Sequence, residues 1–564
     1  MQTLDWILVA IYFIGLVWIV KWSSGKQQTT EDYFLAGRHA SWFVVGASLF
    51  ASNIGSEHIV GLAGSGASGG MAMAHWELHA WVMVLLGWVF VPFYYKSGVY
   101  TMPEFLERRF NSRTRWVLSI VSLVAYVFTK VSVTVYAGAL VFMTLLPDTF
   151  GTPDNAFWVG AFATVILTGI YTVFGGLRAV LYTEVAQTIV LLIGSLMITL
   201  FGLDKLGGWG ELKSVAAHSN MNFDLWRPLT QPGIPWWKNP DFPWLGILIA
   251  SPVIGIWYWC TDQYIVQRTL AAKNLTDARR GALWGGFLKV WPVMIFLVPG
   301  IIGLALHKKG IISIPLKPAT GELDGDQVFA TMVSTLLPAG LRGLVVAGLL
   351  SALMSSLASL FNSCATLFTI DIYEKLRPGK TQRQYVTVGR IATGFVVIAG
   401  LIWIPIMKQM AGGGIYKYLQ AVQGYLAPPI TAVFLLGLFW RRINATGAFY
   451  GLVVGFALGM TKLIIEAIAS QKGITTGPLS VIAEFNFLYY SGVLLVISTV
   501  IIIALSFMTD APTESQTRGL TWRGLSAEDK LDIKNSWNKW DVMGTCVVLG
   551  LVLGMYLYFS FWLK

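Results

Sequence analysis

Ionisable side chains lie in the middle of long apolar stretches of this sequence, where a charge is costly. If these stretches cross a membrane, each charge at a helix centre costs at least about 2.5 kcal/mol. Such residues either serve an ion or solute pathway or pair with one another to hold helices together. Both interpretations stay open for Glu57, Lys130 and Asp262. The deepest ionisable residues are Glu57, Glu77, Lys130, Glu184, Asp262 and Lys289.

Small polar residues interrupt two of the apolar stretches. One reads ASNIGSEHIV over 51–60, and the other reads GIWYWCTDQ over 255–263. A continuous hydrophobic helix does not favour Gly and polar residues at its centre. A broken helix frees main-chain carbonyls and helix ends, which secondary transporters use to hold ions and solutes near the membrane midplane. The two interruptions therefore predict two broken helices. Because these helices are five spans apart, they also suggest that the chain contains two structural repeats.

The whole chain has the composition of a membrane protein. Its 564 residues are 55% hydrophobic and 12% charged, whereas soluble domains carry about 25% charged residues. About 20 apolar residues cross a bilayer as a helix, and we expect a single all-α membrane domain over 1–564 with 14 transmembrane helices. The predicted spans are 4–21, 41–65, 71–95, 116–146, 156–174, 179–203, 243–267, 281–306, 328–369, 385–407, 416–439, 445–469, 484–507 and 541–562.

The distribution of basic residues predicts how the spans are threaded. With an external N-terminus, the loops that fall inside hold about twice as many Lys and Arg as those outside, as the positive-inside rule requires. This predicts two external termini and explains the net charge of +11 without nucleic acid. The N-terminal stretch has no basic segment or cleavage motif and is expected to be a retained span. Residues 509–539 are expected to be a cytoplasmic connector with a short amphipathic helix.

Several segments, in order, resemble the sodium/glucose cotransporter family of the sodium/solute symporters. They are ASNIGSEHIVGLAGSG (51–66), SGVYTMPEFLERRF (97–110), GGLRAVLYTEVAQT (175–188), WYWCTDQYIVQRTLAAKN (257–274), GLRGLVVAGLLSALMSSLASLFNSCATLFTIDIY (340–373) and YLAPPITAVFLLGLFWRRIN (425–444). The resemblance covers about residues 1–470 and is nearest to the animal glucose and inositol branch. The loop 307–327 lacks the cysteines of those animal proteins, which suggests a bacterial member and its inner, plasma membrane.

The resemblance implies a leucine-transporter-type fold with a five-plus-five inverted repeat. Its parts are an extra first helix (4–21), a first repeat (41–203), a second repeat (243–439) and three additional helices (445–562). It also implies a sugar pocket of hydrogen-bonding and aromatic side chains. The implied pocket residues are Asn53, His58, Trp76, Glu77, Tyr258, Trp259, Lys289, Tyr416, Gln420 and Gln423.

The chemistry of this implied pocket suits a sugar, whose hydroxyls both donate and accept. An ionised Glu accepts, a Lys donates, and Asn or Gln amides do both. Without the resemblance, His58 would more readily be a packing histidine. His58, His75 and His79 do not have the spacing of a metal motif, and the three cysteines form neither a disulfide framework nor a metal motif.

The family's sodium site is implied at the carbonyls of Ala51, Ile54 and Ala352 and the hydroxyls of Ser355 and Ser356. Neutral oxygen ligands suit a hard monovalent cation. On their own, the two serines would be read as a helix-packing surface.

A second sodium site of some members would use Glu184 and Ser359 here. Ala358 stands where a two-sodium member has a hydroxyl, which favours one sodium per cycle. Gly255 replaces a polar pocket residue of some relatives, Lys417 lies near the expected outer gate, and the Ser-Glu-His triplet at 56–58 also resembles inositol transporters.

The predicted function is sodium-coupled symport of a glucose- or galactose-like monosaccharide into the cell by alternating access. The alternative is a symporter of myo-inositol or another small polar solute, such as an amino acid or sialic acid. A membrane sensor is disfavoured because no large cytoplasmic segment is present, and an intramembrane enzyme because no catalytic constellation appears. The expected partners are solute, sodium and lipid, with no nucleic acid and no obligate protein partner.

Overall fold

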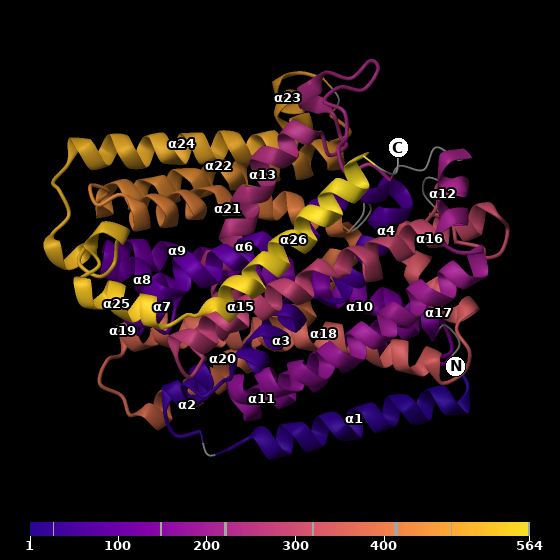
Figure 1. The fold of residues 1–564 in the computed structure, drawn as a ribbon, viewed down its shortest axis with the longest axis horizontal. Coiled ribbons are helices and arrows are strands. Elements are labelled where there is room, and N and C mark those ends of the chain that lie inside the picture. The colour runs from indigo at the N-terminus through magenta and orange to yellow at the C-terminus, as the bar shows by residue number, and fades with distance from the viewer. Residues whose placement is uncertain are drawn as a thin grey trace.

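The chain forms an all-helical bundle whose helices run mainly along the long axis of the molecule (Figure 1). This computed structural model describes residues 1–25, 27–146, 149–218, 223–317, 321–410, 415–474 and 476–561, without the side chains of 128, 403, 406–410, 415, 416, 470 and 561. Within these ranges twelve helical runs are long and apolar enough to cross a membrane, and β-structure is limited to isolated bridges.

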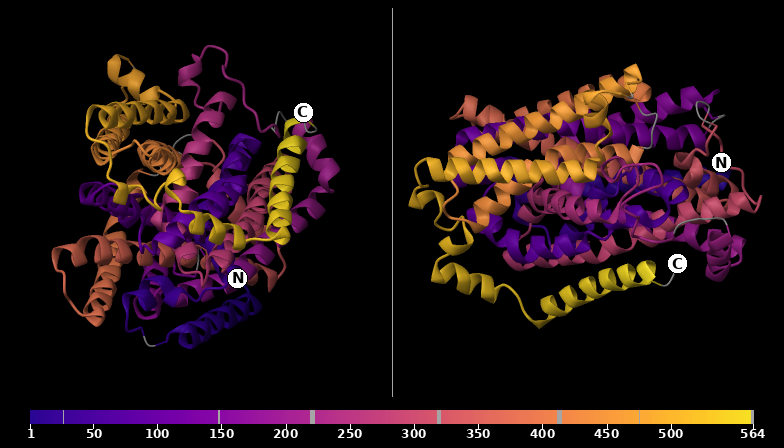
Figure 2. Two further views of the ribbon diagram at one scale, coloured as in Figure 1. Left: turned by 60° about the vertical axis from the view of Figure 1, so that its left-hand side comes forward. Right: turned by 90° about the horizontal axis from the view of Figure 1, so that it is seen from above.

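The first helix lies at the edge of the bundle (Figures 1 and 2). α1 (Thr3–Ser23) exposes most of its apolar side chains, as a helix facing lipid does. Its buried Asp5 turns inward and accepts hydrogen bonds from the main-chain N–H groups of Gly340 (2.7 Å) and Gly343 (2.9 Å). These groups belong to the start of α18, so one carboxylate caps a distant helix and fixes α1 to the bundle.

The first half of the chain forms helices that surround the break at residues 54–55. They are α2 (Thr30–Leu35), η1 (Ala36–Arg38), α3 (Trp42–Asn53), α4 (Ser56–Gly69), η2 (Gly70–Met73), α5 (Ala74–Glu77), α6 (Ala80–Leu85), η3 (Leu86–Phe90), α7 (Val91–Ser97), α8 (Met102–Arg109), α9 (Ser112–Ala125), η4 (Tyr126–Val131), α10 (Ser132–Leu145) and α11 (Pro153–Leu206).

The second half surrounds the break at residue 262. It comprises α12 (Trp209–His218), η5 (Trp236–Lys238), α13 (Trp244–Ile256), η6 (Trp257–Thr261), α14 (Gln263–Leu270), α15 (Leu275–Val290), η7 (Val293–Leu297), α16 (Val298–Lys308), η8 (Gly325–Gln327), α17 (Val328–Leu336), α18 (Leu341–Thr366), η9 (Leu367–Tyr373), α19 (Glu374–Leu376), α20 (Gln382–Met410) and α21 (Ile415–Phe439).

In the C-terminal part, α22 and α24 pack against each other and against α21, and the last helix, α26, lies across the bundle (Figure 1). It comprises α22 (Ala445–Lys472), α23 (Pro478–Glu484), α24 (Phe487–Met508), η10 (Glu514–Gln516), η11 (Trp522–Gly524), α25 (Ala527–Asn535) and α26 (Lys539–Phe561). The short helix expected in the connector is α25.

The long helix α11 reverses direction at one glycine. Gly176 has φ 56° and ψ −164°, a conformation that side-chain-bearing residues rarely adopt. Tyr171, before the glycine, donates from its hydroxyl to the Met354 carbonyl at 3.0 Å, and Glu184, after it, meets Ser359 one turn further along α18. Because both arms reach the same level of α18, the chain doubles back at Gly176.

These breaks bear on the predicted number of spans. Dividing α11 at Gly176, separating α4 from the following segment at Gly70, and joining α3 to α4 accommodates all fourteen predicted stretches. The count of fourteen membrane crossings itself stays a prediction, because twelve helical runs meet the criteria of length and apolarity in the described ranges. The long predicted span 328–369 is in fact two helices, α17 and α18.

α1 begins and α26 ends at the same end of the bundle (Figure 1). The short helices α2, α8, α19 and α25 gather at the opposite end, together with the loops of high basic content (Figures 1 and 2). The arrangement agrees with an even number of crossings.

Candidate functional site

Both predicted helix interruptions are confirmed. α3 ends at Asn53 and α4 begins at Ser56, with Ile54 (φ −87°, ψ 90°) and Gly55 (φ −92°, ψ 179°) extended between them. The second break is at Asp262 (φ −80°, ψ 125°), between the π-helical turn η6 and α14. Each break leaves main-chain groups outside the helical ladder and free for other partners.

A buried cavity of about 30 Å³ lies between the two breaks. Of the ten residues predicted for the pocket, eight line this cavity: Asn53, His58, Trp76, Tyr258, Trp259, Lys289, Gln420 and Gln423. Glu77 stands directly behind, with its Oε2 2.5 Å from Lys289 Nζ. The side chain of Tyr416 lies outside the described residues. A cavity of this size has room for only about two water molecules, so a monosaccharide can enter only if the walls move apart.

Four polar atoms of the cavity wall are buried without a hydrogen-bond partner among the described residues. They are the acceptors Asn53 Oδ1, Glu57 Oε2 and Gln420 Oε1 and the donor Trp76 Nε1. Leaving such a group unpaired costs about 1–3 kcal/mol. The amide nitrogen of Asn53 is satisfied, since it donates to the Tyr258 hydroxyl at 3.0 Å. A ligand that both donates and accepts, as a hydroxyl does, matches this set of atoms.

Aromatic rings close the cavity on two sides. Tyr258 and Trp259 pack edge-to-face with centroids 5.1 Å apart, and Trp76 packs edge-to-face on Phe242 at 5.7 Å. Lys289 Nζ lies 5.7 Å from the centre of the Trp259 ring. Such rings present apolar faces suited to the C–H groups of a small ring solute.

Sequence reasoning placed no pocket role on Lys130, yet the residue lines the cavity. Its Nζ lies 2.6 Å from Asp262 Oδ2 and 4.5–5.1 Å from the ring centres of four aromatic residues, Tyr126, Trp257, Tyr258 and Tyr264. Once Lys289 is matched with Glu77, Lys130 is the one cation left among the deep residues of the sequence, but Glu57, Glu184 and Asp262 were all possible partners for it.

The residues predicted to hold sodium come together where α18 passes the first break. Ser355 Oγ lies 2.9 Å from the Ala51 carbonyl and 3.0 Å from the Ala352 carbonyl. Its single proton serves one of these carbonyls at a time. Ser356 Oγ donates to the Ser52 carbonyl at 3.1 Å, and Ile54 is the first residue after the end of α3. The cluster consists of neutral oxygen atoms, which are suitable ligands for a hard cation.

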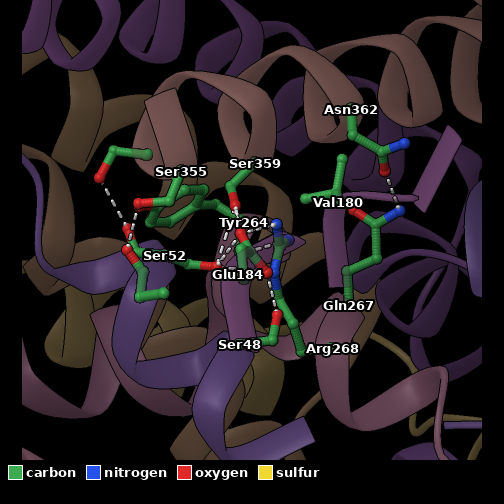
Figure 3. A network of polar contacts seen from close by, with 12 residues as sticks. Ser48, Ser52, Val180, Glu184, Tyr264, Gln267, Arg268, Ser355, Ser359 and Asn362 are labelled. Carbon is green, nitrogen blue, oxygen red and sulfur yellow. Dashed lines mark hydrogen bonds and ion pairs between the residues drawn. The ribbon is translucent and has the colours of Figure 1, made fainter. Parts of the chain in front are cut away.

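Glu184 is the centre of a second polar network (Figure 3). Its carboxylate accepts hydrogen bonds from the hydroxyls of Ser48, Ser359 and Ser52, the last at 2.9 Å. Arg268 brings its Nη2 to 3.7 Å from the same carboxylate and donates from Nε to Ser52 Oγ at 3.0 Å. Ser52 therefore joins this network to the serine cluster on α18.

Arg268 directly follows the predicted span 243–267 and was therefore counted among the basic loop residues, but it lies in α14 and is fully buried. Sequence reasoning also missed Ser48 and Ser52. The spacing of four residues between them places both hydroxyls on one face of α3, and this spacing could have indicated a shared partner.

Comparison with known proteins agrees with this geometry. Residues 33–455 match the Sodium:solute symporter family. Sodium/glucose cotransporter 4 of Danio rerio is 37% identical over 96% of this chain and 84% of its own length. The sodium/myo-inositol cotransporter of Mus musculus is 39% identical, with 93% and 76% covered.

Among solved structures, the substrate-bound outward-open state of a Na⁺-coupled sialic acid symporter superposes with a TM-score of 0.74 at 21% identity, covering 91% of this chain and 99% of that chain. This likeness confirms the predicted all-helical, leucine-transporter-type fold class. With its apolar helices, the chain is a multi-pass membrane protein, and it belongs to the Sodium:solute symporter family.

Proposed function

We propose that this chain carries a small ring polyol into the cell together with sodium. The preferred solute is a glucose- or galactose-like monosaccharide. The observation that supports this proposal is the set of orphaned atoms on Asn53, Gln420 and Trp76 around one cavity beside the Glu77–Lys289 pair. A site built to hydrogen-bond hydroxyls rejects solutes that lack them, because its buried polar groups then stay unpaired.

The second candidate solute is myo-inositol, a ring that consists wholly of hydroxyl-bearing carbons. Relatives named as sodium/glucose and as sodium/myo-inositol cotransporters match this chain with 37% and 39% identity. The similar identities favour neither solute, and the donors and acceptors of the cavity suit both.

The coupling ion is proposed to bind at the carbonyls of Ala51, Ile54 and Ala352 and the hydroxyls of Ser355 and Ser356. A sodium ion there would join α3 to α18 and favour the outward-open state. Solute then binds, the gates close, and the two halves, 41–203 and 243–439, rock to open inward. Release of sodium to the cytoplasm weakens the solute site and completes the step.

We propose one sodium per cycle. Glu184 already has a guanidinium and three hydroxyl donors around its carboxylate, so its charge is compensated without a second ion. One charge moving through 100 mV contributes about 2.3 kcal/mol, and a tenfold gradient adds about 1.4 kcal/mol. One ion can therefore concentrate solute several hundredfold.

The proposed location is the plasma membrane, with both termini outside and the end that carries α2, α8, α19 and α25 inside. The basic content of that end supports this orientation. The resemblance to animal members without their loop cysteines points to a bacterial inner membrane.

Uptake by the purified protein in liposomes tests the proposal. Labelled glucose, galactose and myo-inositol are offered under an inward sodium gradient, with potassium and choline gradients as controls. We expect uptake of at least one polyol with sodium alone. Equal uptake in all three cation gradients would contradict sodium coupling, and sodium-driven uptake of an amino acid or sialic acid in place of every polyol would contradict the solute class.

A further inference from the structure

His79 and Gly255 form a matched pair in the wall of the cavity. His79 follows α5 at the turn into α6, and Gly255 lies in α13, one residue before its end. A Cβ atom on Gly255 would lie 3.1 Å from Cε1 and Nε2 of the His79 ring and 3.2 Å from Cδ2. Carbon atoms pack best at about 3.5–4.0 Å. The imidazole therefore occupies space that a side chain at position 255 would otherwise fill.

The imidazole is held in this place. Nε2 of His79 is 2.8 Å from the hydroxyl of Ser251, one turn before Gly255 on the same helix. α13 is itself anchored by Thr431, whose hydroxyl donates to the Val253 carbonyl at 2.9 Å. The ring is buried, with 3% of its surface exposed, and it faces the cavity that Tyr258 and Lys289 also line. Because this contact holds the ring against α13, a methyl group at position 255 must displace the ring by a few tenths of an ångström.

We propose that His79 contacts the transported solute and determines which ring polyols fit, with Gly255 as the residue that makes room for it. This inference rests on the proposed function. A neutral imidazole has one donor and one acceptor nitrogen, so a ring bound to Ser251 through Nε2 keeps Nδ1 for a hydroxyl. Its bulk on the α13 side selects compact rings over rings with an added substituent on that edge.

The test compares wild type with Gly255→Ala, His79→Ala and the double variant in sodium-driven uptake. Gly255→Ala should lower kcat/KM for the preferred polyol about tenfold, because the new methyl pushes the ring into the cavity. In the His79→Ala background the same methyl meets open space, and we expect Gly255→Ala to have little further effect. Gly550→Ala, on α26 with nothing within 4 Å of the new Cβ, is the matched control and should behave as wild type.

Selectivity separates a solute contact from a packing role. For wild type and His79→Ala we would compare kcat/KM for the preferred sugar and for its methyl glycosides. One methyl in a fitted pocket changes kcat/KM by about tenfold or more. Removing the imidazole should therefore shift the ratio toward a methylated ring by at least about tenfold, mainly through KM, while the sodium dependence stays as in wild type.

Two results would overturn the inference. One is an equal loss from Gly255→Ala with and without His79; the other is an unchanged preference ratio in His79→Ala protein that elutes and melts as wild type. If His79→Ala does not fold, His79→Asn, which retains a polar group facing Ser251, replaces it under the same criteria. Failure of wild type to take up any polyol with sodium is a different outcome, and it contradicts the proposed function itself.

Discussion

Lys130 and Asp262 form a buried ion pair at the second helix break, with Nζ 2.6 Å from Oδ2. Their side chains are 8% and 2% exposed. The Tyr126 hydroxyl also donates to this carboxylate. The pair therefore connects η4 of the first half to the unwound point of the second half, beside the cavity.

Breaking this pair should destabilise the protein strongly. Asp262→Asn leaves an ammonium group in a buried site lined by aromatic rings, and the loss of one partner of a buried pair costs about 3–5 kcal/mol. We expect a marked fall in melting temperature in detergent. Glu211→Gln, which breaks the half-exposed pair with Lys309, should cost at most about 1 kcal/mol. Similar losses in the two variants would contradict the structural role of the pair.

The serine cluster should control sodium affinity separately from solute selectivity. Ser355→Ala and Ser356→Ala each remove a hydroxyl ligand from the proposed ion site, and Ser355 contacts the carbonyls of Ala51 and Ala352. We expect the sodium concentration for half-maximal uptake to rise at least about tenfold, the loss of about 1.4 kcal/mol of binding. The preference among polyols should stay unchanged. If both variants kept the sodium dependence of wild type, the assignment of the sodium site to this cluster would be contradicted.

Removing the solute's hydrogen-bond partners should weaken solute binding at least about tenfold, and Glu77→Ala should also destabilise the protein because it breaks a buried ion pair. Gln420→Ala takes away an orphaned acceptor, whereas Glu77→Ala also leaves Lys289 without its carboxylate. Sodium-dependent binding of the labelled solute to purified protein measures the effect. We expect losses of at least about tenfold in Gln420→Ala and larger ones in Glu77→Ala. Normal transport by both would exclude this cavity as the solute site.

The ratio of sodium to solute should be one and should not depend on the charge of Glu184. Glu184→Gln keeps the size of the side chain and can still accept hydrogen bonds from the serines. Reversal potentials in proteoliposomes give the ratio for wild type and variant. A wild-type ratio of two that drops to one in Glu184→Gln would show that the carboxylate binds a second sodium ion. That result would contradict the proposal that Arg268 compensates the charge of Glu184.

The contact of α25 with α7 should weaken in acid. Lys96 donates a hydrogen bond to Asp529 at 2.6 Å and lowers the pKa of this carboxyl from 3.8 to about 2. Because the folded pKa lies below the unfolded one, the contact is fully present above about pH 4 and is lost as pH falls through about 2.

Hydrogen exchange of the α25 amides measures this contact. We expect protection to drop by up to about fivefold across that window, since such partly exposed pairs contribute at most about 1 kcal/mol. Asp529→Asn should remove most of the pH dependence, leaving only the second pair of Lys96 with Asp532 at 3.1 Å, whereas Glu528→Gln on the same helix should keep it. Unaltered protection from pH 5 to pH 2 in wild type would argue against the contact.

Much of the fold follows from the sequence because membrane insertion restricts what apolar stretches can do. Long apolar runs become helices since no water is present to satisfy main-chain groups. The polar interruptions at 54–55 and 262 can become breaks because non-helical backbone is tolerated at membrane depth where it is buried in protein or lines a cavity, and both breaks were predicted. Four of the predicted residues that line the cavity lie beside these breaks, and the other four come from α5, α15 and α21.

Contacts between distant helices were harder to predict. The partners of Glu184 and Lys130 depend on the rotation of α3, α14 and η4 about their own axes relative to one another. Residue spacing within a single helix does not predict this relative orientation. Arg268 was misjudged because a basic residue after a polar run looks like a loop residue. In the structure, neighbouring helices bury Arg268, and its guanidinium lies 3.7 Å from the Glu184 carboxylate.

The reversal at Gly176 has a consequence for how the chain can be cut. The turn lies under α2, where the hydroxyl of Tyr33 donates to the Val173 carbonyl at 3.2 Å and Gln27 donates to the Gly175 carbonyl. A protease needs an extended strand of several exposed residues, and this covered turn does not provide one. Brief digestion should therefore nick the chain in the exposed connector before α26 and leave the two arms of α11 joined.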